Sequence, residues 1–156
     1  MARTARVLED PLNELVLSIF WLNGFFLDAA DRLTAGSGLT TARWQVLGAV
    51  LHEPLTVAAI ARDMGLARQS VQRTANLLVA EGSCEYVPNP AHRRAKLLSA
   101  TDHGLDSVRQ LGPRVTEWSK RVRESVGDDV IDAATVSVKE LMSALSRDEA
   151  QLLGDD

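Results

Sequence analysis

The sequence has little of the chemistry that marks enzymes and secreted proteins. It contains one cysteine, Cys84, among 156 residues, which excludes an intramolecular disulfide framework and fits a reducing cytoplasm. No glycine-rich phosphate loop, nucleophile elbow or pair of catalytic carboxylates is recognisable. We therefore expect a cytoplasmic protein that is not an enzyme and that needs no cofactor.

Metal-binding chemistry is equally scarce. The three histidines, His52, His92 and His103, and Cys84 show no ligand-like spacing such as CxxC or HExxH. A solvated or phosphate-proximal role is the simpler interpretation of His92 and His103, so we expect no metal site. Cys84 is interpreted as a small buried side chain at the start of a strand, with a redox sensor as the alternative.

Charge of one sign does not dominate the chain. The net charge of −4 argues against a protein that coats nucleic acid without selectivity. Residues 62–96, however, hold six lysines and arginines against three acidic residues, a net charge of +3 that leaves −7 for the remainder. A basic patch on an acidic body favours site-specific binding to DNA.

The centre of the chain predicts two short helices joined by a tight turn. Thr56 is the expected N-cap of a helix over residues 57–64. Gly65 supplies the turn, because glycine tolerates positive φ. The second helix is expected over residues 67–81, and Gly82 ends it.

The second of these helices carries an apolar and a polar stripe. Three apolar residues share one face and are expected to point inward: Val71, Ala75 and Leu78. Four polar residues share another face: Gln69, Gln72, Arg73 and Asn76. Such side chains pair with guanine and adenine edges in the major groove, and the stripe contains no acid. This composition predicts a DNA-recognition helix.

A basic hairpin is expected after this helix, with strands over residues 84–87 and 95–99. A recognition helix followed by an arginine-tipped hairpin is typical of a winged helix-turn-helix. The expected DNA contacts are Arg68, Gln69, Ser70, Gln72, Arg73, Asn76, His92, Arg93, Arg94 and Lys96. The alternative is a winged domain that binds protein, but such a face should expose apolar anchors.

The N-terminal part predicts one apolar helix. Residues 1–9 are polar and expected to fray, and Asp10 caps a helix that starts at Pro11 and runs to about residue 33. Its apolar stretch, residues 15–27, is too short to span a bilayer comfortably, so we expect no membrane association. Asp10 and Glu14 also lie where a signal peptide carries positive charge. A helix this apolar requires cover from a partner subunit or from further helices.

Helices are also expected before and after the winged region. Thr40 caps a helix that ends near His52, because Pro54 stops it. A long helix follows Thr101, with a kink at Gly112 and Pro113. Its heptad-like seam consists of Val108, Leu111, Val115, Trp118 and Val122. After Gly127, a last helix over about residues 129–146 has an apolar stripe of Val130, Ala134, Val138, Leu141 and Leu145.

The predicted fold class is mainly α with a small β-hairpin. A winged helix-turn-helix domain over residues 39–100 is flanked by dimerisation helices in residues 1–38 and 101–156. Three stretches resemble the MarR family of bacterial transcriptional regulators: LTTARWQVLGAV, LTVAAIARDMGLARQSVQRTANLLVAEG and NPAHRRAKLLSATDHG. The resemblance covers about residues 39–104. It implies a homodimeric repressor whose two winged domains bind a pseudo-palindromic site on double-stranded DNA.

Motif position suggests roles for individual residues. Arg73 resembles the recognition-helix arginine of the family, and Arg94 resembles the wing-tip arginine that reaches the minor groove. Thr101 and Gly104 match the threonine and glycine that open the following helix. Three positions depart from the pattern. His92 replaces an acid in the wing, Ala67 replaces a capping residue, and Ser83 with Cys84 replace leucine and valine.

The resemblance also implies a small aromatic or phenolic effector, bound in a cleft between the dimer helices and the winged domain. Candidate lining residues are Trp21, Phe25 and Phe26 in the first helix and Trp44 in the second, with His52 as a polar handle. The alternative is that these aromatic side chains serve core and dimer packing.

Overall fold

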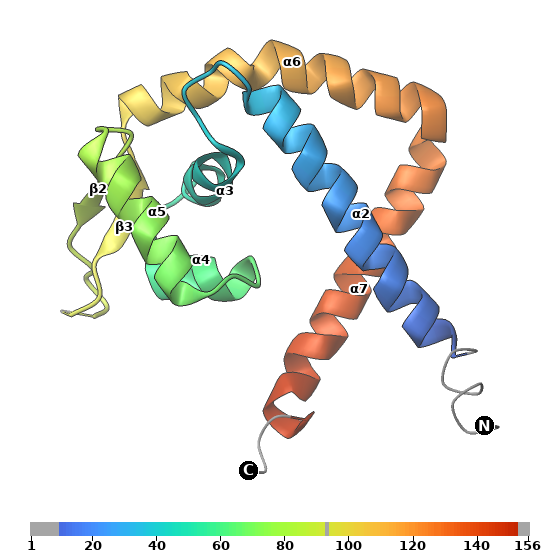
Figure 1. Ribbon diagram of the computed structural model, residues 1–156. Coiled ribbons are helices and arrows are strands. Elements are labelled where there is room, and N and C mark those ends of the chain that lie inside the picture. Colours follow the sequence, from blue (N-terminus) through green and yellow to red (C-terminus); the bar gives the residue numbers. More distant parts are fainter. Residues whose placement is uncertain (1–9, 93, 153–156) are drawn as a thin grey trace. The chain divides into compact units, whose positions relative to one another are not determined.

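The computed structural model describes residues 10–92 and 94–152, with side chains as far as residue 145 (Figure 1). The expected fraying of residues 1–9 lies outside these ranges, as does Arg93. The described chain is mostly helical with a small antiparallel sheet, which confirms the predicted fold class. It divides into two compact units, residues 1–112 and 113–156, and each is described by itself.

The elements follow one another much as the sequence predicts. In chain order they are α2 (Pro11–Thr34), α3 (Thr41–Ala49), β1 (Leu55–Thr56), α4 (Val57–Asp63), α5 (Arg68–Ala80), β2 (Cys84–Val87), β3 (Leu97–Ala100), α6 (Asp102–Val126) and α7 (Asp128–Leu152). Helix α6 begins in the first unit and continues into the second.

Side-chain caps explain where three of the helices begin. Asp10 accepts a hydrogen bond from the backbone N–H of Leu12 at 2.9 Å, which starts α2. Thr40 and Thr56 accept equivalent bonds at the starts of α3 and α4. A cap satisfies backbone donors that have no partner within the helix, so it fixes the first turn. Ala67 makes no such bond at the start of α5, as its side chain predicts.

Two expectations about local structure are corrected. Helix α3 ends at Ala49, three residues before His52, because the N–H groups of Val50 and Leu51 make tight i→i−3 bonds instead. The chain then adds a short strand, β1, that the sequence analysis did not foresee. It pairs with β3, placing Leu55 opposite Leu98, so the sheet has the order β1-β3-β2.

The core of the first unit lies where α3, α4 and α5 meet the sheet (Figure 1). Its largest fully buried side chains are Leu47, Ile60, Leu78, Leu98, Leu111, Val46 and Val71. An ion pair of 2.7 Å between Arg43 of α3 and Glu81 at the end of α5 adds a polar link across this packing. The inward face predicted for α5, Val71, Ala75 and Leu78, is therefore confirmed.

The start of α6 is fastened to the turn that follows α5. The Thr101 hydroxyl donates to the carbonyl of Gly82 at 2.6 Å and accepts from the N–H of Gly104 at 3.2 Å. The Thr101 N–H donates to the Ser83 carbonyl at 3.1 Å. A Cβ at position 104 would overlap that same carbonyl oxygen. Threonine and glycine are therefore required here by hydrogen bonding and by close backbone approach.

Helix α6 has the extent that the sequence predicts, and α7 is longer. Helix α6 runs through Pro113 without a break, and the division between the two units falls directly before this proline. Gly127 has φ +91° and separates α6 from α7, which extends to Leu152 rather than to residue 146. The predicted seam of α6 is the buried or half-buried side of that helix, whereas most of the predicted stripe of α7 is exposed.

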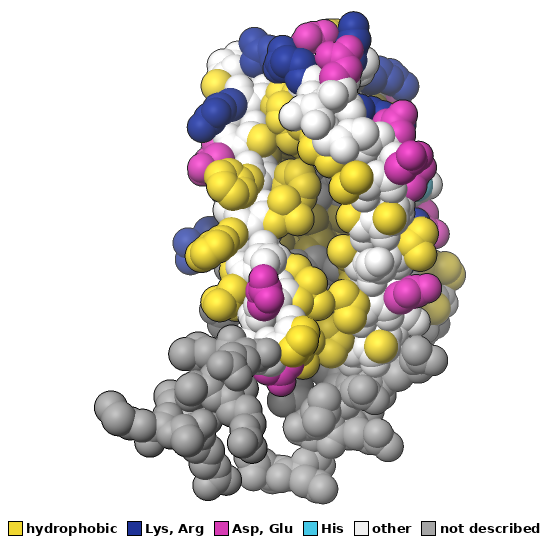
Figure 2. Space-filling model, turned by 90° about the vertical axis from the view of Figure 1, so that its right-hand side faces the viewer, with side chains coloured by type: hydrophobic (Ala, Val, Ile, Leu, Met, Phe, Trp, Pro, Cys, Tyr) yellow, Lys and Arg dark blue, Asp and Glu magenta, His cyan; other side chains and the backbone are white. Residues whose placement is uncertain are grey.

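Helix α2 exposes most of its apolar side chains. Trp21 is 72% exposed and Phe25 is 71% exposed, and nine other large apolar residues of this helix are also exposed. Figure 2 shows exposed apolar side chains, in yellow, along the helices that it presents. By length and composition, the 24-residue α2 would suffice to cross a membrane. Core helices of soluble proteins and signal sequences meet the same criterion, so the expected absence of membrane association stays a prediction.

Candidate nucleic-acid interface

A tight turn sets the position of α5 against α4. Gly65 has φ +61°, a conformation that glycine adopts without a steric penalty. The N–H groups of Gly65 and Leu66 bond back to the carbonyls of Arg62 and Ala61. The two helices pack against each other immediately after this turn, as in a helix-turn-helix.

The packing of α5 forces its polar stripe outward. Val71, Ala75 and Leu78 are buried, so the opposite side of the helix faces solvent. An open hollow of about 410 Å³ on that side is lined by five residues, all of them predicted DNA contacts: Arg68, Gln69, Gln72, Arg73 and Asn76. Ser70 is exposed in the first turn of α5. The structure therefore brings the helix residues of the predicted site together.

The wing is a short hairpin, and hydrogen bonds are described on the first side of its turn. Strand β2 pairs antiparallel with β3 from Cys84 opposite Ala100 to Val87 opposite Leu97. Beyond the strands, the Asn89 side chain accepts from the N–H of Ala91 at 2.9 Å, and the His92 N–H donates to the Asn89 carbonyl. His92, Arg94 and Lys96 are exposed, and Arg93 lies outside the described residues.

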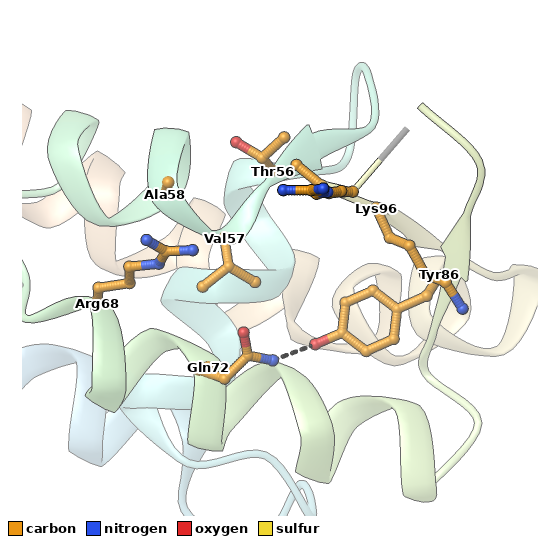
Figure 3. A pocket seen from close by; sticks show the side chains of 9 residues that line it. Thr56, Val57, Ala58, Arg68, Gln72, Tyr86 and Lys96 are labelled. Carbon is orange, nitrogen blue, oxygen red and sulfur yellow. Dashed lines mark hydrogen bonds between the residues drawn. The ribbon is translucent and has the colours of Figure 1, made fainter. Parts of the chain in front are cut away.

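Wing and recognition helix share a second, cationic hollow (Figure 3). Its volume is about 320 Å³, and its walls come from α4, α5 and the wing. Arg68, Arg94 and Lys96 line it, and no acidic residue does. In the described parts of the chain, the ion pairs involve none of these cations, nor Arg73. The hollow therefore offers uncompensated positive charge, which suits phosphate groups.

One residue of this surface, Tyr86 on β2, is not among the residues predicted from the sequence. Its hydroxyl accepts a hydrogen bond from the Gln72 amide at 2.7 Å and donates to the Asn76 side chain at 3.0 Å. Gln72 also donates to Asn76 at 3.0 Å. Tyr86 is the only tyrosine of the chain and stands one strand residue before the end of β2. Its place on the strand next to the wing turn was the signal in the sequence. The partners of its hydroxyl could not be deduced, because they depend on how the hairpin packs on α5.

Cys84 lies beneath the surface rather than on it. The side chain is buried, and this burial raises the pKa of the thiol to about 11, because the anionic thiolate loses its hydration. At neutral pH the side chain is therefore a protonated thiol with little nucleophilic character. These properties favour the structural interpretation of Cys84 over the redox sensor.

The candidate effector residues differ in how exposed they are. Trp21 and Phe25 are exposed on α2, Trp44 is half-buried on α3, and His52 is exposed in the connection to β1. Helix α3 is linked to α2 by a hydrogen bond from the Thr41 hydroxyl to the Asp31 carboxylate. The two hollows described above are not lined by any of these four residues. The effector site stays a prediction.

Metal-ligating side chains do not cluster in the described parts of the chain. Among the side chains that the structure describes, in residues 10–92 and 94–145, no group of three or more histidines, cysteines, aspartates or glutamates is placed to hold a metal ion. The chemistry that this surface does offer is amide, hydroxyl and cationic, which are groups that bind phosphates and base edges.

Comparison with known sequences relates the region that carries this surface to the MarR family. The MarR family model matches residues 37–95, which span α3, α4, α5, the wing turn and its preceding strands. An uncharacterised protein of Mycobacterium tuberculosis is 34% identical over 138 residues, covering 88% of this chain and 96% of the relative. The transcriptional activatory protein BadR of Rhodopseudomonas palustris is 25% identical, covering 85% of this chain and 77% of that protein.

Solved structures share the fold at lower identity. A MarR family transcriptional regulator from Rhodococcus sp. RHA1 matches with a TM-score of 0.73 and 20% identity, covering 85% of this chain and 94% of that one. CouR from Rhodococcus jostii RHA1, solved with p-coumaroyl-CoA bound, matches with a TM-score of 0.70 and 22% identity, covering 86% and 93%. Both likenesses concern the arrangement of the backbone over most of each chain.

Proposed function

Because this chain belongs to the MarR family of transcriptional regulators, we propose that it binds a pseudo-palindromic DNA operator as a homodimer. One observation carries the proposal: the outward face of α5 and the wing together present amides and unpaired cations without an acid among the lining residues. Arginine, glutamine and asparagine recognise base edges, and arginine and lysine also neutralise phosphates. MarR family regulators are in general soluble cytoplasmic proteins without enzymatic activity, and the proposal includes that location.

Two elements contact DNA in this proposal, helix α5 and the wing. Helix α5 enters the major groove, where Arg73 contacts a base edge or a phosphate. The wing reaches the neighbouring minor groove through Arg94, and Lys96 contacts the backbone. The absence of exposed aromatic anchors on the polar stripe of α5 argues against the alternative, a winged domain that docks on another protein.

The dimer is supported by the exposed apolar surface of α2. Contiguous apolar surface of this extent on a soluble protein marks an interaction site. A second copy of the chain is its natural occupant in this proposal, with helices α6 and α7 contributing to the same assembly. Two-fold symmetry then presents two copies of α5 to half-sites whose centres are about 10 bp apart.

A small ligand is proposed to regulate DNA binding. CouR, which shares the fold, binds p-coumaroyl-CoA, an aromatic thioester. The aromatic residues Trp21, Phe25 and Trp44 would supply apolar walls for an aromatic or phenolic effector, with His52 as a polar contact. The ligand weakens operator binding only if it binds the DNA-incompetent dimer more tightly than the competent one. Repression follows if the operator overlaps a promoter, whereas the relative BadR is named as an activatory protein.

Operator binding is tested by selecting DNA from a random duplex library and titrating the selected site. Arg73→Ala and Arg94→Ala should each weaken specific binding by about 1–3 kcal/mol, the range for a good base contact. Arg109→Ala is the matched control, because Arg109 is exposed on α6 and paired with Asp106. Unchanged affinity for both test variants, or failure of the wild-type protein to select any motif, would contradict the proposal.

Effector binding is tested by tryptophan fluorescence with a panel of aromatic acids, in the presence and absence of operator. A coupling of about 1–3 kcal/mol would weaken DNA binding roughly 5- to 150-fold. Quenching without any change in operator affinity would establish a ligand site but no switch. A reporter gene placed behind the operator separates repression from activation by the sign of its response.

A further inference from the structure

Three polar atoms at the junction of α5 and the wing form a closed hydrogen-bonded triangle. The Tyr86 hydroxyl donates to Asn76 Oδ1 at 3.0 Å and accepts from Gln72 Nε2 at 2.7 Å. The third side is the 3.0 Å bond from Gln72 Nε2 to Asn76 Oδ1. Figure 3 shows Gln72 with its nitrogen toward Tyr86 and its oxygen turned away, into the hollow.

The triangle consumes most of the hydrogen-bonding capacity of its members. An amide nitrogen carries two hydrogens, and both hydrogens of Gln72 are used. The single hydroxyl hydrogen of Tyr86 is used as well, and Asn76 Oδ1 accepts both bonds. Two groups remain for an external partner: Gln72 Oε1, which only accepts, and Asn76 Nδ2, which only donates.

We propose that Tyr86 is a specificity-determining residue that holds these two amides in one orientation, so that α5 meets DNA with an acceptor at Gln72 and a donor at Asn76. This inference rests on the proposed function, since it concerns which base edges α5 reads. Tyr86 acts through its neighbours and is a positioning residue.

The fixed orientation changes what Gln72 can recognise. A glutamine that pairs bidentately with adenine must donate to N7 while it accepts from the N6 amino group. With both hydrogens engaged, Gln72 accepts from an exocyclic amino group and cannot donate to N7. Asn76 donates to acceptors such as N7 and O6 of guanine. One C·G pair presents an amino donor beside two such acceptors in the major groove, so it complements the two groups together.

Tyr86 suits this role because the strand that carries it is held firmly. Its register partner on β3 is Leu98, which is fully buried in the core. The Tyr86 ring is half-buried between the strand and α5. Gln72 and Asn76 lie one turn apart on a solvated helix, where two amides alone would not fix each other's orientation. A hydroxyl held by a separate element fixes the orientation of both amide groups.

The experiment compares base preferences rather than overall affinity. Wild type, Tyr86→Phe, Gln72→Ala and the double variant, all as full-length chains, are each used to select from the same random duplex library. Tyr86→Phe deletes one oxygen atom and frees one Gln72 hydrogen. We expect its preference for adenine to rise roughly fivefold or more at one position of each half-site, the discrimination of a gained bidentate contact. In the Gln72→Ala background the same substitution should leave adenine preference unchanged.

The outcomes separate this proposal from the one on which it rests. If wild type selects a motif and Tyr86→Phe selects the same base preferences at every position, the role of Tyr86 is overturned and DNA binding stands. If the change persists in the Gln72→Ala background, Tyr86 acts by another route and the proposal is equally overturned. If wild type selects no motif, both proposals fail.

A second measurement does not depend on any variant folding. In the free wild-type protein, the side-chain amide hydrogens of Gln72 should exchange with solvent at least several-fold more slowly than those of Gln69. Gln69 is the matched control, because it is an exposed glutamine on the same helix, one turn earlier. Equal exchange rates for the two glutamines would show that the triangle does not hold Gln72, and the proposal would be overturned.

Discussion

Helices α5 and α2 belong to the same unit and both expose side chains to solvent, but the exposed side chains differ in kind. The exposed face of α5 consists of amides and arginines, which keep their hydration until a charged partner replaces it. The exposed face of α2 consists of leucine, phenylalanine and tryptophan side chains, whose contact with water is unfavourable. The exposed face of α5 is therefore suited to reversible binding of a polyanion, and that of α2 is suited to a permanent interface.

The difference extends to what stabilises each helix. The inner face of α5 is fully buried in the core of the first unit, so α5 is held whether or not a partner is present. Of α2, in contrast, only Thr34 is buried. We therefore expect substitutions on α5 to act on folding or DNA affinity independently of protein concentration. Substitutions on α2 should act through assembly.

The largest expected effect comes from the inner face of α5. Leu78→Ala should lower the free energy of unfolding by about 2–5 kcal/mol, because it removes a fully buried side chain and leaves a cavity. Leu77→Ala is the matched control, since the neighbouring leucine is 44% exposed, and its effect should stay below about 1 kcal/mol. Urea titration measures both. Similar losses for the two variants would contradict the assignment of the inner face.

The next effect concerns the junction that fixes α5 to α6. Gly104→Ala should destabilise the protein by about 1–3 kcal/mol, because the added methyl group meets the Ser83 carbonyl and the backbone must shift. Gly112→Ala, at a helical glycine with open space around it, should instead stabilise by about 0.5–1 kcal/mol. Thermal unfolding of the two variants should therefore move in opposite directions. A tolerated alanine at position 104 would refute the close approach.

The third effect concerns the exposed apolar surface of α2. Trp21→Ser should weaken the proposed dimer by about 2 kcal/mol, roughly 30-fold in its dissociation constant, as expected for a large aromatic side chain in an interface. Asn23→Ala, an exposed polar change on the same helix, should leave the dimer intact. Sedimentation over a range of concentrations measures both variants. A wild-type protein that is monomeric at micromolar concentration would contradict the proposed assembly.

The smallest effect concerns Cys84, directly behind the turn that ends α5. Its folded pKa of about 11 lies above the ordinary value of 9.0, so the folded state binds the thiol proton more tightly. The resulting stabilisation is complete below pH 9 and is lost as the pH rises to about 11. We expect wild type to lose roughly 1–2 kcal/mol more than Cys84→Ala over that interval. Parallel stability curves from pH 9 to 11 would show that Cys84 is not desolvated.

The sequence by itself determined the elements that are stabilised by interactions between residues a few positions apart. Asp10, Thr40 and Thr56 cap helices through bonds to N–H groups two or three residues ahead, so their positions give the helix starts. Gly65 and Gly82 mark turns because they adopt positive φ, which is a property of the residue itself. The periodic burial of α5 follows from the spacing of its apolar residues, and the polar face opposite it follows from the same spacing.

Only the tertiary structure decided the contacts between elements distant along the chain. Strand β1 is two residues long, too short for any alternation, and exists because Leu55 and Thr56 lie beside β3. Tyr86 reaches Gln72 and Asn76 because the hairpin folds back onto α5, and Gly104 is needed because α6 starts against Ser83. Local hydrogen bonds and periodicity are encoded in neighbouring residues, whereas these contacts depend on how packed elements meet, a property of the whole core.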